Sequence, residues 1–174
     1  MLFQRMLRAA KLDVSLYEEV EADQTALGQA MLVVVLHGVA AGIGSYDEAG
    51  ATGLVFGTIG QLIGWFVWAL VTYLVGAKLL PEAQTHADLG QLLRTIGFSA
   101  APGLLLALGV IPFVGGIIAF IAQIWMLITF VIAVRQALDY NSTVRAVAVC
   151  VLGWLLMVAI TAALMLIFGG FLTK

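Results

Sequence analysis

Few residues in this chain have the chemistry of catalysis or metal binding, and they are spread along its length. The chain holds two histidines, His37 and His86, and one cysteine, Cys150. No pair of His, Cys, Asp or Glu residues has the spacing of a metal-ligand motif. A serine–histidine–acid set would need residues from different depths, because Ser99 lies within an apolar stretch and Ser45 lies outside one. The sequence therefore favours a protein that is not an enzyme and that uses neither a metal nor another cofactor.

Three strongly polar side chains lie inside otherwise apolar stretches: His37, Gln61 and Gln123. An ionisable group at membrane depth is a candidate functional residue, and His37 could serve a proton or ligand path because histidine titrates near neutral pH. The alternative is structural, with a neutral His37 donating one hydrogen bond to another helix. We favour the structural role because the sequence offers no buried charged partner for a relay. Gln61 and Gln123 are interpreted likewise, as contacts between helices worth about 0.6 kcal/mol each.

Charged residues also gather in the links that we place in the cytoplasm. The segment 134–146 is the densest polar cluster outside the N-terminal region. Within it, Arg135 and Asp139 are four residues apart, the spacing of a side-chain pair on a helix. These links predict an interaction surface made of Lys78, His86, Asp88, Arg94, Arg135, Asp139 and Arg145. The alternative is ordinary loop polarity combined with the charges that orient a membrane protein.

The elements that must position these residues are membrane-spanning helices. Hydrophobic residues make up 63% of the 174-residue chain, charged residues only 10%, and the mean hydropathy is +1.09. Such a chain has too little polar surface to coat a soluble globule. The apolar runs are continuous, which indicates helices rather than barrel strands. We predict an all-α integral membrane protein, a five-helix bundle with spans at about 25–44, 54–79, 91–111, 113–135 and 144–171.

The basic residues fall on every second link, which predicts the orientation. They are Arg5, Arg8 and Lys11 before the first span, Lys78 and Arg94 between the second and third, and Arg135 and Arg145 between the fourth and fifth, with only Lys174 on the other side. Basic residues of short loops stay in the cytoplasm, so the N-terminus is predicted inside and the C-terminus outside. The net charge of −2 offers no basic face for nucleic acid.

Residues 1–24 are predicted to form a cytosolic leader before the membrane domain at 25–174. At 100° per residue its first turns separate into an apolar arc and a basic arc (Leu2, Phe3, Met6, Leu7 and Ala10 against Arg5, Arg8 and Lys11). This pattern favours a helix lying in the lipid interface, and the alternative is a solvated leader. Ser15 and Glu18 have the spacing of a capping box that would begin a second short helix.

The third span and the glycines suggest local irregularity and close packing. Pro102 removes a helix hydrogen bond, so together with Gly97 it predicts a kinked third helix. Small residues at four-residue intervals let helices approach closely, either within the bundle or across a homodimer seam. They are Gly38 and Gly42 in the first span and Gly53, Gly57, Gly60 and Gly64 around the second. The tryptophans lie mostly well inside the spans, so we expect them to pack in the bundle or to line a lipid-facing groove (Trp65, Trp68, Trp125 and Trp154).

Several segments together resemble the Yip family, the Ypt/Rab-interacting membrane proteins. Residues 93–102, Leu-Arg-Thr-Ile-Gly-Phe-Ser-Ala-Ala-Pro, resemble the family's "LR..GYs..P" segment. Residues 111–116, Trp125, the run 135–140 with Arg145-Ala146, and the leader around 17–21 are similar to its prokaryotic branch. The resemblance covers nearly the whole chain and implies a five-span fold.

The resemblance implies less about partners. Eukaryotic members bind prenylated Rab GTPases, but this chain has a short leader and lacks a "DLYGP"-type segment before the spans, which argues against a small GTPase partner. We therefore expect a non-enzymatic scaffold or organising subunit of the bacterial cytoplasmic (inner) membrane, in contact with the lipid bilayer and with other membrane proteins or copies of itself. The alternative is a protein that moves a lipid or small solute past the broken third span. A weaker alternative is an enzyme acting on lipid headgroups near Arg94 and Arg135.

Overall fold

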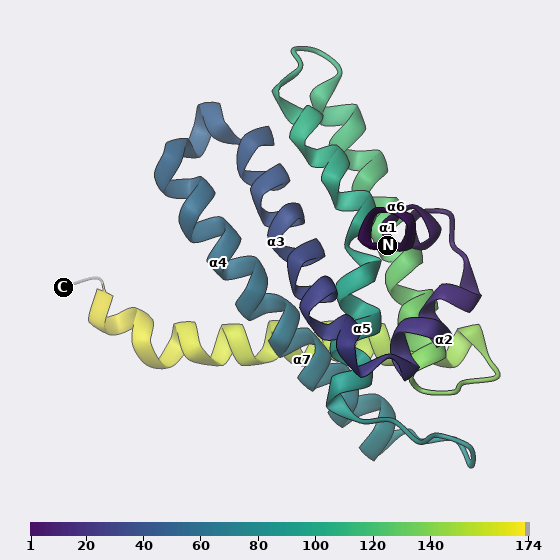
Figure 1. Ribbon diagram of the computed structural model, residues 1–174. Helices are drawn as coiled ribbons and strands as arrows, with labels where there is room; N and C mark the ends of the chain where they lie inside the picture. Colours follow the sequence, from purple (N-terminus) through teal and green to yellow (C-terminus); the bar gives the residue numbers. More distant parts are fainter. Residues whose placement is uncertain (173–174) are drawn as a thin grey trace.

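Helices account for all of the regular structure in residues 1–172, the part of the backbone that the computed structural model describes; side chains are described for these residues except 47, 48, 164 and 166–172. Lys174, expected on the outer side, lies outside the described residues. Figure 1 shows the arrangement, with the leader helices beside the bundle. The elements are α1 (Leu2–Ala10), α2 (Val14–Ala22), η1 (Gln24–Ala26), α3 (Leu27–Gly44), α4 (Tyr46–Thr72), η2 (Tyr73–Leu79), α5 (Leu89–Ser99), η3 (Ala101–Val110), α6 (Gly115–Ala137) and α7 (Thr143–Leu172).

Five helical segments are long and apolar enough to cross a membrane, which confirms the predicted architecture. They are Gln24–Gly44, Ala49–Leu79, Leu89–Val110, Gly115–Ala137 and Thr143–Ala163. Large apolar side chains on their outer faces are exposed, for example Phe56 at 69% and Phe120 at 68%. The second span has a break near its start at Gly50, whose φ of 61° is readily adopted by glycine. The exposed apolar side chains of the five spans form a surface suited to lipid rather than to water.

The third span changes helix type at the predicted position. Its α-helix, α5, ends at Ser99, and the ten residues of η3 continue as a 3₁₀-helix with Pro102 in its first turn. Because proline has no N–H, it fits the first turn of a helix but not its interior. The Thr129 hydroxyl on α6 donates to the Ser99 carbonyl at 2.7 Å and so satisfies a group at the break. Gly97 instead allows α5 to pack closely on α3, since an added Cβ would lie 2.7 Å from the Cβ of Ala30 on α3.

The glycines of the first and second spans have different surroundings. An added Cβ at Gly38 or Gly42 would lie within 2.9 Å of an α4 backbone Cα, so these two glycines permit the close contact of α3 with α4. At Gly57, Gly60 and Gly64 of α4, an added Cβ would meet nothing within 4 Å. The predicted packing of the first two spans therefore depends on the glycines of α3. A homodimer seam along α4 stays a prediction.

The leader folds against the bundle. The apolar sides of α1 and α2 are buried against α5, η3 and α6 through Met6, Ala9, Leu16, Tyr17 and Val20. The Trp125 indole on α6 donates to the Ala10 carbonyl at 2.7 Å and fixes the end of α1. The N-cap of α2 is Asp13, which accepts from the Ser15 N–H, so the predicted capping box of Ser15 with Glu18 is wrong.

The basic arc of α1 faces acids of the same leader. Arg5 pairs with Glu19 at 2.9 Å and with Asp23 at 2.8 Å. Arg8 pairs with Asp13 at 2.7 Å and also with Glu19. The hydrogen bond from Arg8, with those from Ser15, lowers the pKa of Asp13 to about 2. These pairs join α1 to α2, while the placement of α1 in the lipid interface stays a prediction.

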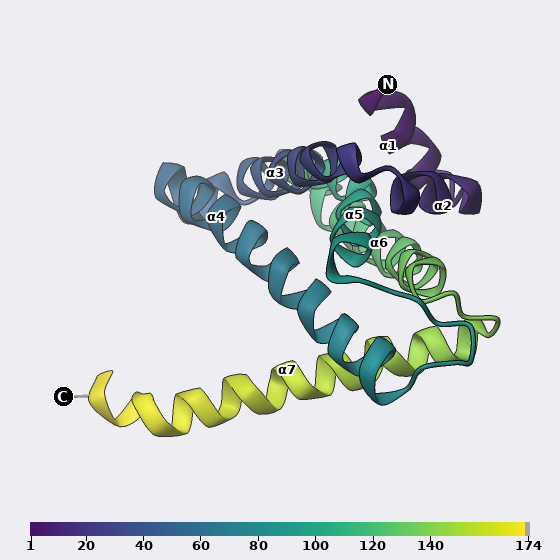
Figure 2. The same cartoon turned by 60° about the horizontal axis from the view of Figure 1, so that its bottom comes forward.

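The last helix, α7, crosses the others obliquely instead of running beside them, and it diverges from α4 toward the C-terminus (Figure 2). Among the side chains of α7 that the structure describes, the buried ones lie in its first half and include Ala146, Val149 and Cys150. Gly153 follows them, and an added Cβ there would lie 3.3 Å from side-chain atoms of Trp68 and Val71 on α4. Beyond this point the described apolar side chains of α7 are largely exposed, for example Met165 at 70%.

Candidate functional site

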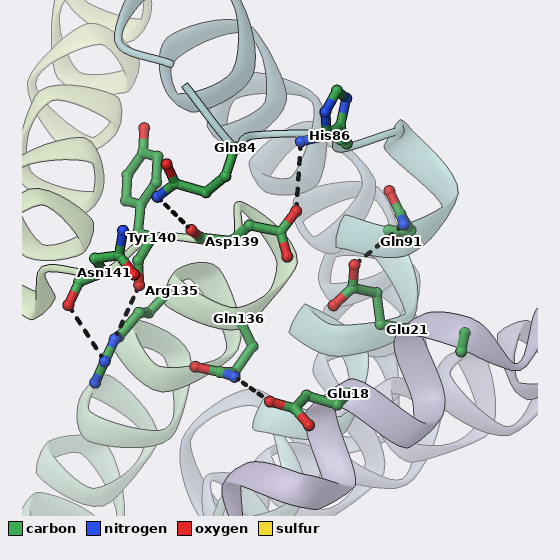
Figure 3. A pocket seen from close by; sticks show the side chains of 11 residues that line it. Glu18, Glu21, Gln84, His86, Gln91, Arg135, Gln136, Asp139, Tyr140 and Asn141 are labelled. Atoms are coloured by element: carbon green, nitrogen blue, oxygen red, sulfur yellow. Dashed lines mark hydrogen bonds between the residues drawn. The ribbon is translucent and has the colours of Figure 1, made fainter. Parts of the chain in front are cut away.

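Two concave regions contain the residues singled out from the sequence. The first, which we call the polar cleft, is a cavity of about 760 Å³ at the end of the bundle beside α2 (Figure 3). Three separate segments build it: α2, the link 80–88 with the start of α5, and the end of α6 with the turn 138–142. Its lining residues are Glu18, Glu21, Ala22, Gln84, His86, Gln91, Arg135, Gln136, Asp139, Tyr140 and Asn141.

Hydrogen bonds between the two links fix this end of the bundle. The Tyr140 hydroxyl is shared between the carbonyls of Gly76 and Leu80, at 2.9 and 2.8 Å. The Thr85 hydroxyl donates to the Leu138 carbonyl at 2.9 Å. Arg145 pairs with Glu82 at 3.1 Å. These bonds hold the end of the second span against the end of the fourth, although the sequence separation is about 60 residues.

Arg135 and Asp139 lie at the C-terminal end of α6 and fix the turn that follows it. The Arg135 guanidinium donates to the carbonyls of Tyr140 and Asn141, at 3.1 and 3.3 Å, and to the Thr143 hydroxyl. Asp139 has a φ of 53°, the left-handed conformation common just after a helix. Its carboxylate accepts a hydrogen bond from the backbone N–H of His86 at 3.4 Å. The predicted pairing of Arg135 with Asp139 is wrong, because the guanidinium binds carbonyls of the turn that follows the helix instead.

Arg94 attaches the leader rather than contributing to an exposed surface. Its side chain is buried at 7% exposure. It donates from Nε to the Val20 carbonyl at 2.9 Å and from a terminal nitrogen to the Glu21 carbonyl. These are the last carbonyls of α2, which have no partner within the helix. A guanidinium at a helix C-terminus also complements the helix dipole. Arg94 therefore has a structural role and does not belong to the predicted interaction surface.

Glu21 is the most perturbed acid of the cleft. It accepts a hydrogen bond from the Gln91 amide at 3.1 Å. Partial burial is the main cause that raises its pKa to about 7; Asp139 adds to the rise and Arg94 opposes it. Glu18, on the same face of α2, accepts from the Gln136 amide at 3.0 Å. The cleft thus holds one acid that titrates near neutral pH and two further acids, Glu18 and Asp139.

The structure brings together part of the predicted interaction surface. His86, Arg135 and Asp139 line the polar cleft, and Lys78, His86 and Asp88 line an adjacent cavity of about 410 Å³. Asp88 also caps α5 in a capping box with Gln91. Sequence reasoning missed Glu18 and Glu21. Their spacing of three residues on a short helix was the available signal, because it places both on one face.

The second region, which we call the apolar groove, has a volume of about 960 Å³ and lies between α3, α4, α5, α6 and α7. The three intramembrane polar residues, His37, Gln61 and Gln123, all line it. Three of the four tryptophans line it too: Trp65, Trp68 and Trp154. These three tryptophans line a groove, one of the two placements expected for them, while a lipid-facing position of the groove stays a prediction; Trp125 contacts the leader instead.

The fold and these two regions define an all-helical integral membrane protein with five spans and a folded leader. Residues 15–168 match the Yip1 domain family, and because the match covers most of the chain, the protein belongs to that family. The resemblance noted from the sequence is thereby confirmed. Neither a curated protein nor a solved structure gives a significant match.

Proposed function

We propose that this protein is a non-enzymatic organising subunit of a bacterial cytoplasmic membrane, which holds another membrane protein at the polar cleft. The observation that carries the proposal is the construction of the cleft. Three segments distant in sequence form one open polar cavity, and hydrogen bonds between the links keep its shape. A preformed surface of this kind lowers the entropic cost of binding a partner.

The charge of the cleft indicates the chemistry of the partner. Three carboxyl groups line it, from Glu18, Glu21 and Asp139, against one guanidinium, from Arg135. That guanidinium already donates to carbonyls of the turn that follows its helix. A partner segment bearing lysine or arginine therefore complements the cleft, since opposite charges steer association and fix its register.

A pull-down from mild detergent tests this proposal, with a tag after Lys174 and mass spectrometry of the eluate. We expect a stoichiometric partner with the wild type and its loss with Glu18→Gln combined with Asp139→Asn. Both substitutions keep the side-chain shape, and asparagine accepts the left-handed conformation of Asp139. The matched control is Lys11→Gln, which removes an exposed charge outside the cleft and should leave the partner bound.

Two results would oppose the proposal. A monomer that elutes alone from all three preparations would remove the organising role. A partner that stays bound to the double variant would place the contact elsewhere on the protein.

The proposal also requires the cleft to face the cytoplasm, in agreement with the basic links. Single cysteines at Gln84 and at Phe113, in a Cys150→Ala background, test the orientation with a membrane-impermeant maleimide. Phe113 lies in the link before α6 and is fully exposed. In intact spheroplasts we expect labelling at position 113 only, and labelling at position 84 after lysis. The opposite pattern would place the cleft outside.

The alternative function, movement of a lipid or small solute, is favoured by one observation. The third span is not a continuous α-helix, because η3 replaces its second half. Broken helices often form transport pathways. Vesicles containing the purified protein should then flip a fluorescent phospholipid faster than empty vesicles, and equal rates would exclude this function for that lipid.

A further inference from the structure

The apolar groove has a histidine in its wall that is mostly buried but not sealed from the groove. His37 is 6% exposed, and its imidazole forms no hydrogen bond with the part of the chain that the structure describes. Gly103 on η3 makes room for it, since an added Cβ would lie 2.9 Å from the imidazole Nε2. Among the described residues, the fully buried side-chain polar atom without a hydrogen bond is the Tyr17 hydroxyl. The His37 nitrogens are not sealed off in this way, so they are accessible to a ligand in the groove.

The polar groups of the groove lie far from either end of their helices. His37 precedes the end of α3 at Gly44 by about 10 Å, at a rise of about 1.5 Å per residue. Gln123 follows the start of α6 at Gly115 by about 12 Å, and Gln61 is about 16 Å beyond the break at Gly50. A bridging water is disfavoured at this depth, because the hydrocarbon core excludes water. The remaining candidate partner is a molecule dissolved in the lipid.

The walls of the groove specify the kind of molecule. Among the described residues, the lining includes no Asp, Glu, Lys or Arg, so a charged headgroup would find no counter-charge there. Four aromatic side chains contribute to the walls: Trp65, Trp68, Trp154 and Phe130. The Trp65 indole is fixed by donating to the Leu93 carbonyl at 3.0 Å, and Trp68 packs edge-on against Phe130 with ring centres 5.7 Å apart. Ordered aromatic walls of this kind favour a flat ring.

We propose that the apolar groove binds a quinone-type lipid, with its uncharged planar ring between the tryptophans and its apolar tail along the groove. The ring carbonyls would accept hydrogen bonds from the His37 imidazole and from the Gln61 or Gln123 amide. The volume of about 960 Å³ accommodates such a ring and part of its tail. Binding of this ligand requires neither the polar cleft nor lipid movement, so the inference goes beyond the proposed organising role.

Tryptophan fluorescence tests the inference directly, because a quinone quenches nearby indoles. The full-length protein in nanodiscs of phosphatidylcholine is titrated with decylubiquinone. We expect saturable quenching, since three of the four tryptophans line the groove.

A glycine pair on α4 gives a matched control. Gly64 lines the groove and has open space around an added side chain, so Gly64→Leu should fill the groove without disturbing the packing. Gly57 is equally open but does not line it. We expect Gly64→Leu to lower the affinity at least tenfold and Gly57→Leu to leave it unchanged. Both His37→Leu and Gln123→Leu should weaken binding by about five- to tenfold, the loss of one hydrogen bond. Gln123 is exposed, so its variant tests the ligand contact without removing a packed side chain.

Two results would overturn the inference. One is quenching that rises linearly with quinone and is the same in Gly64→Leu, which indicates partition into the lipid. The other is displacement of decylubiquinone by an equal concentration of dioleoylglycerol, which indicates a groove that accepts any lipid chain. The pull-down at the polar cleft reports independently of both results.

Discussion

The polar cleft and the apolar groove differ in how their polar side chains are satisfied. At the cleft and in the leader beside it, five arginines each bond to an acid or carbonyl of the same chain: Arg5, Arg8, Arg94, Arg135 and Arg145. In the groove, His37, Gln61 and Gln123 form no hydrogen bond with any described residue. The first set stabilises the fold, whereas the second set is available to a ligand. The arginines at the cleft are therefore committed to the fold, which leaves the acids of the cleft to contact a partner.

The largest predicted effect is at Arg94. Arg94→Gln removes both hydrogen bonds to the last carbonyls of α2 and leaves those carbonyls without their partner. We expect a loss of about 3–5 kcal/mol in the free energy of unfolding, because each bond to a buried charged group contributes about 1.5–3 kcal/mol. Limited proteolysis should show faster cleavage within residues 1–24, and denaturation in mixed micelles measures the free energy.

Arg145→Gln is the control for Arg94. Its ion pair with Glu82 is half exposed, and exposed pairs contribute at most about 1 kcal/mol. Equal losses in the two variants would contradict the assignment of Arg94 as the residue that attaches the leader.

The second prediction uses the two glycine surfaces of the first and second spans. Gly42→Ala places a Cβ 2.8 Å from the Leu54 Cα, so one helix must move, and we expect a loss of about 1–3 kcal/mol. Gly57→Ala meets nothing within 4 Å, and we expect a gain of about 0.5–1 kcal/mol from the lower backbone entropy of the unfolded chain. Changes of the same sign in both variants would contradict the packing of α3 on α4.

The five spans could be predicted because hydrophobic length determines them directly. The position of the break at Pro102 could also be predicted, since proline lacks the donor that an α-helix needs. The tertiary partners could not. Arg94 has the composition of a surface charge, and only the fold shows that the carbonyls of α2 surround it. Glu21 likewise lines the cleft only because α2 packs on α5. Periodicity shows which face of a helix is polar, but not which distant segment meets that face.

The third prediction concerns pH. The pKa of Glu21 is raised to about 7 from an ordinary value of 4.5, so the folded protein binds its proton more tightly than the unfolded chain. Stability therefore falls as the pH rises from about 4.5 to 7 and is constant above that. Glu21→Gln should flatten this dependence and stabilise the protein at pH 8 by about 1–2 kcal/mol, after allowance for partial solvent screening. Denaturation at pH 5 and pH 8 measures the difference. A variant with an unchanged pH profile would show that Glu21 is ordinarily solvated.

The smallest predicted effect is at Tyr17. It tests whether a polar group without a hydrogen bond in the leader only lowers the stability of the fold, unlike the polar groups of the groove. Tyr17 is fully buried in the leader, and its hydroxyl has no hydrogen-bond partner among the described residues. Tyr17 lines neither the cleft nor the groove, so its unpaired hydroxyl lowers the stability of the fold without contacting a ligand. Tyr17→Phe should stabilise the protein by about 0.5–1 kcal/mol.

His37→Leu should change the stability of the apo protein by no more than a similar amount, because the imidazole forms no hydrogen bond with the described residues. It differs in one respect: it should weaken quinone binding, whereas Tyr17→Phe should not. Denaturation and quinone titration of the two variants side by side separate the cases. If neither variant lost affinity for the quinone, His37 would not contact the ligand, and the distinction between groove and leader would fail.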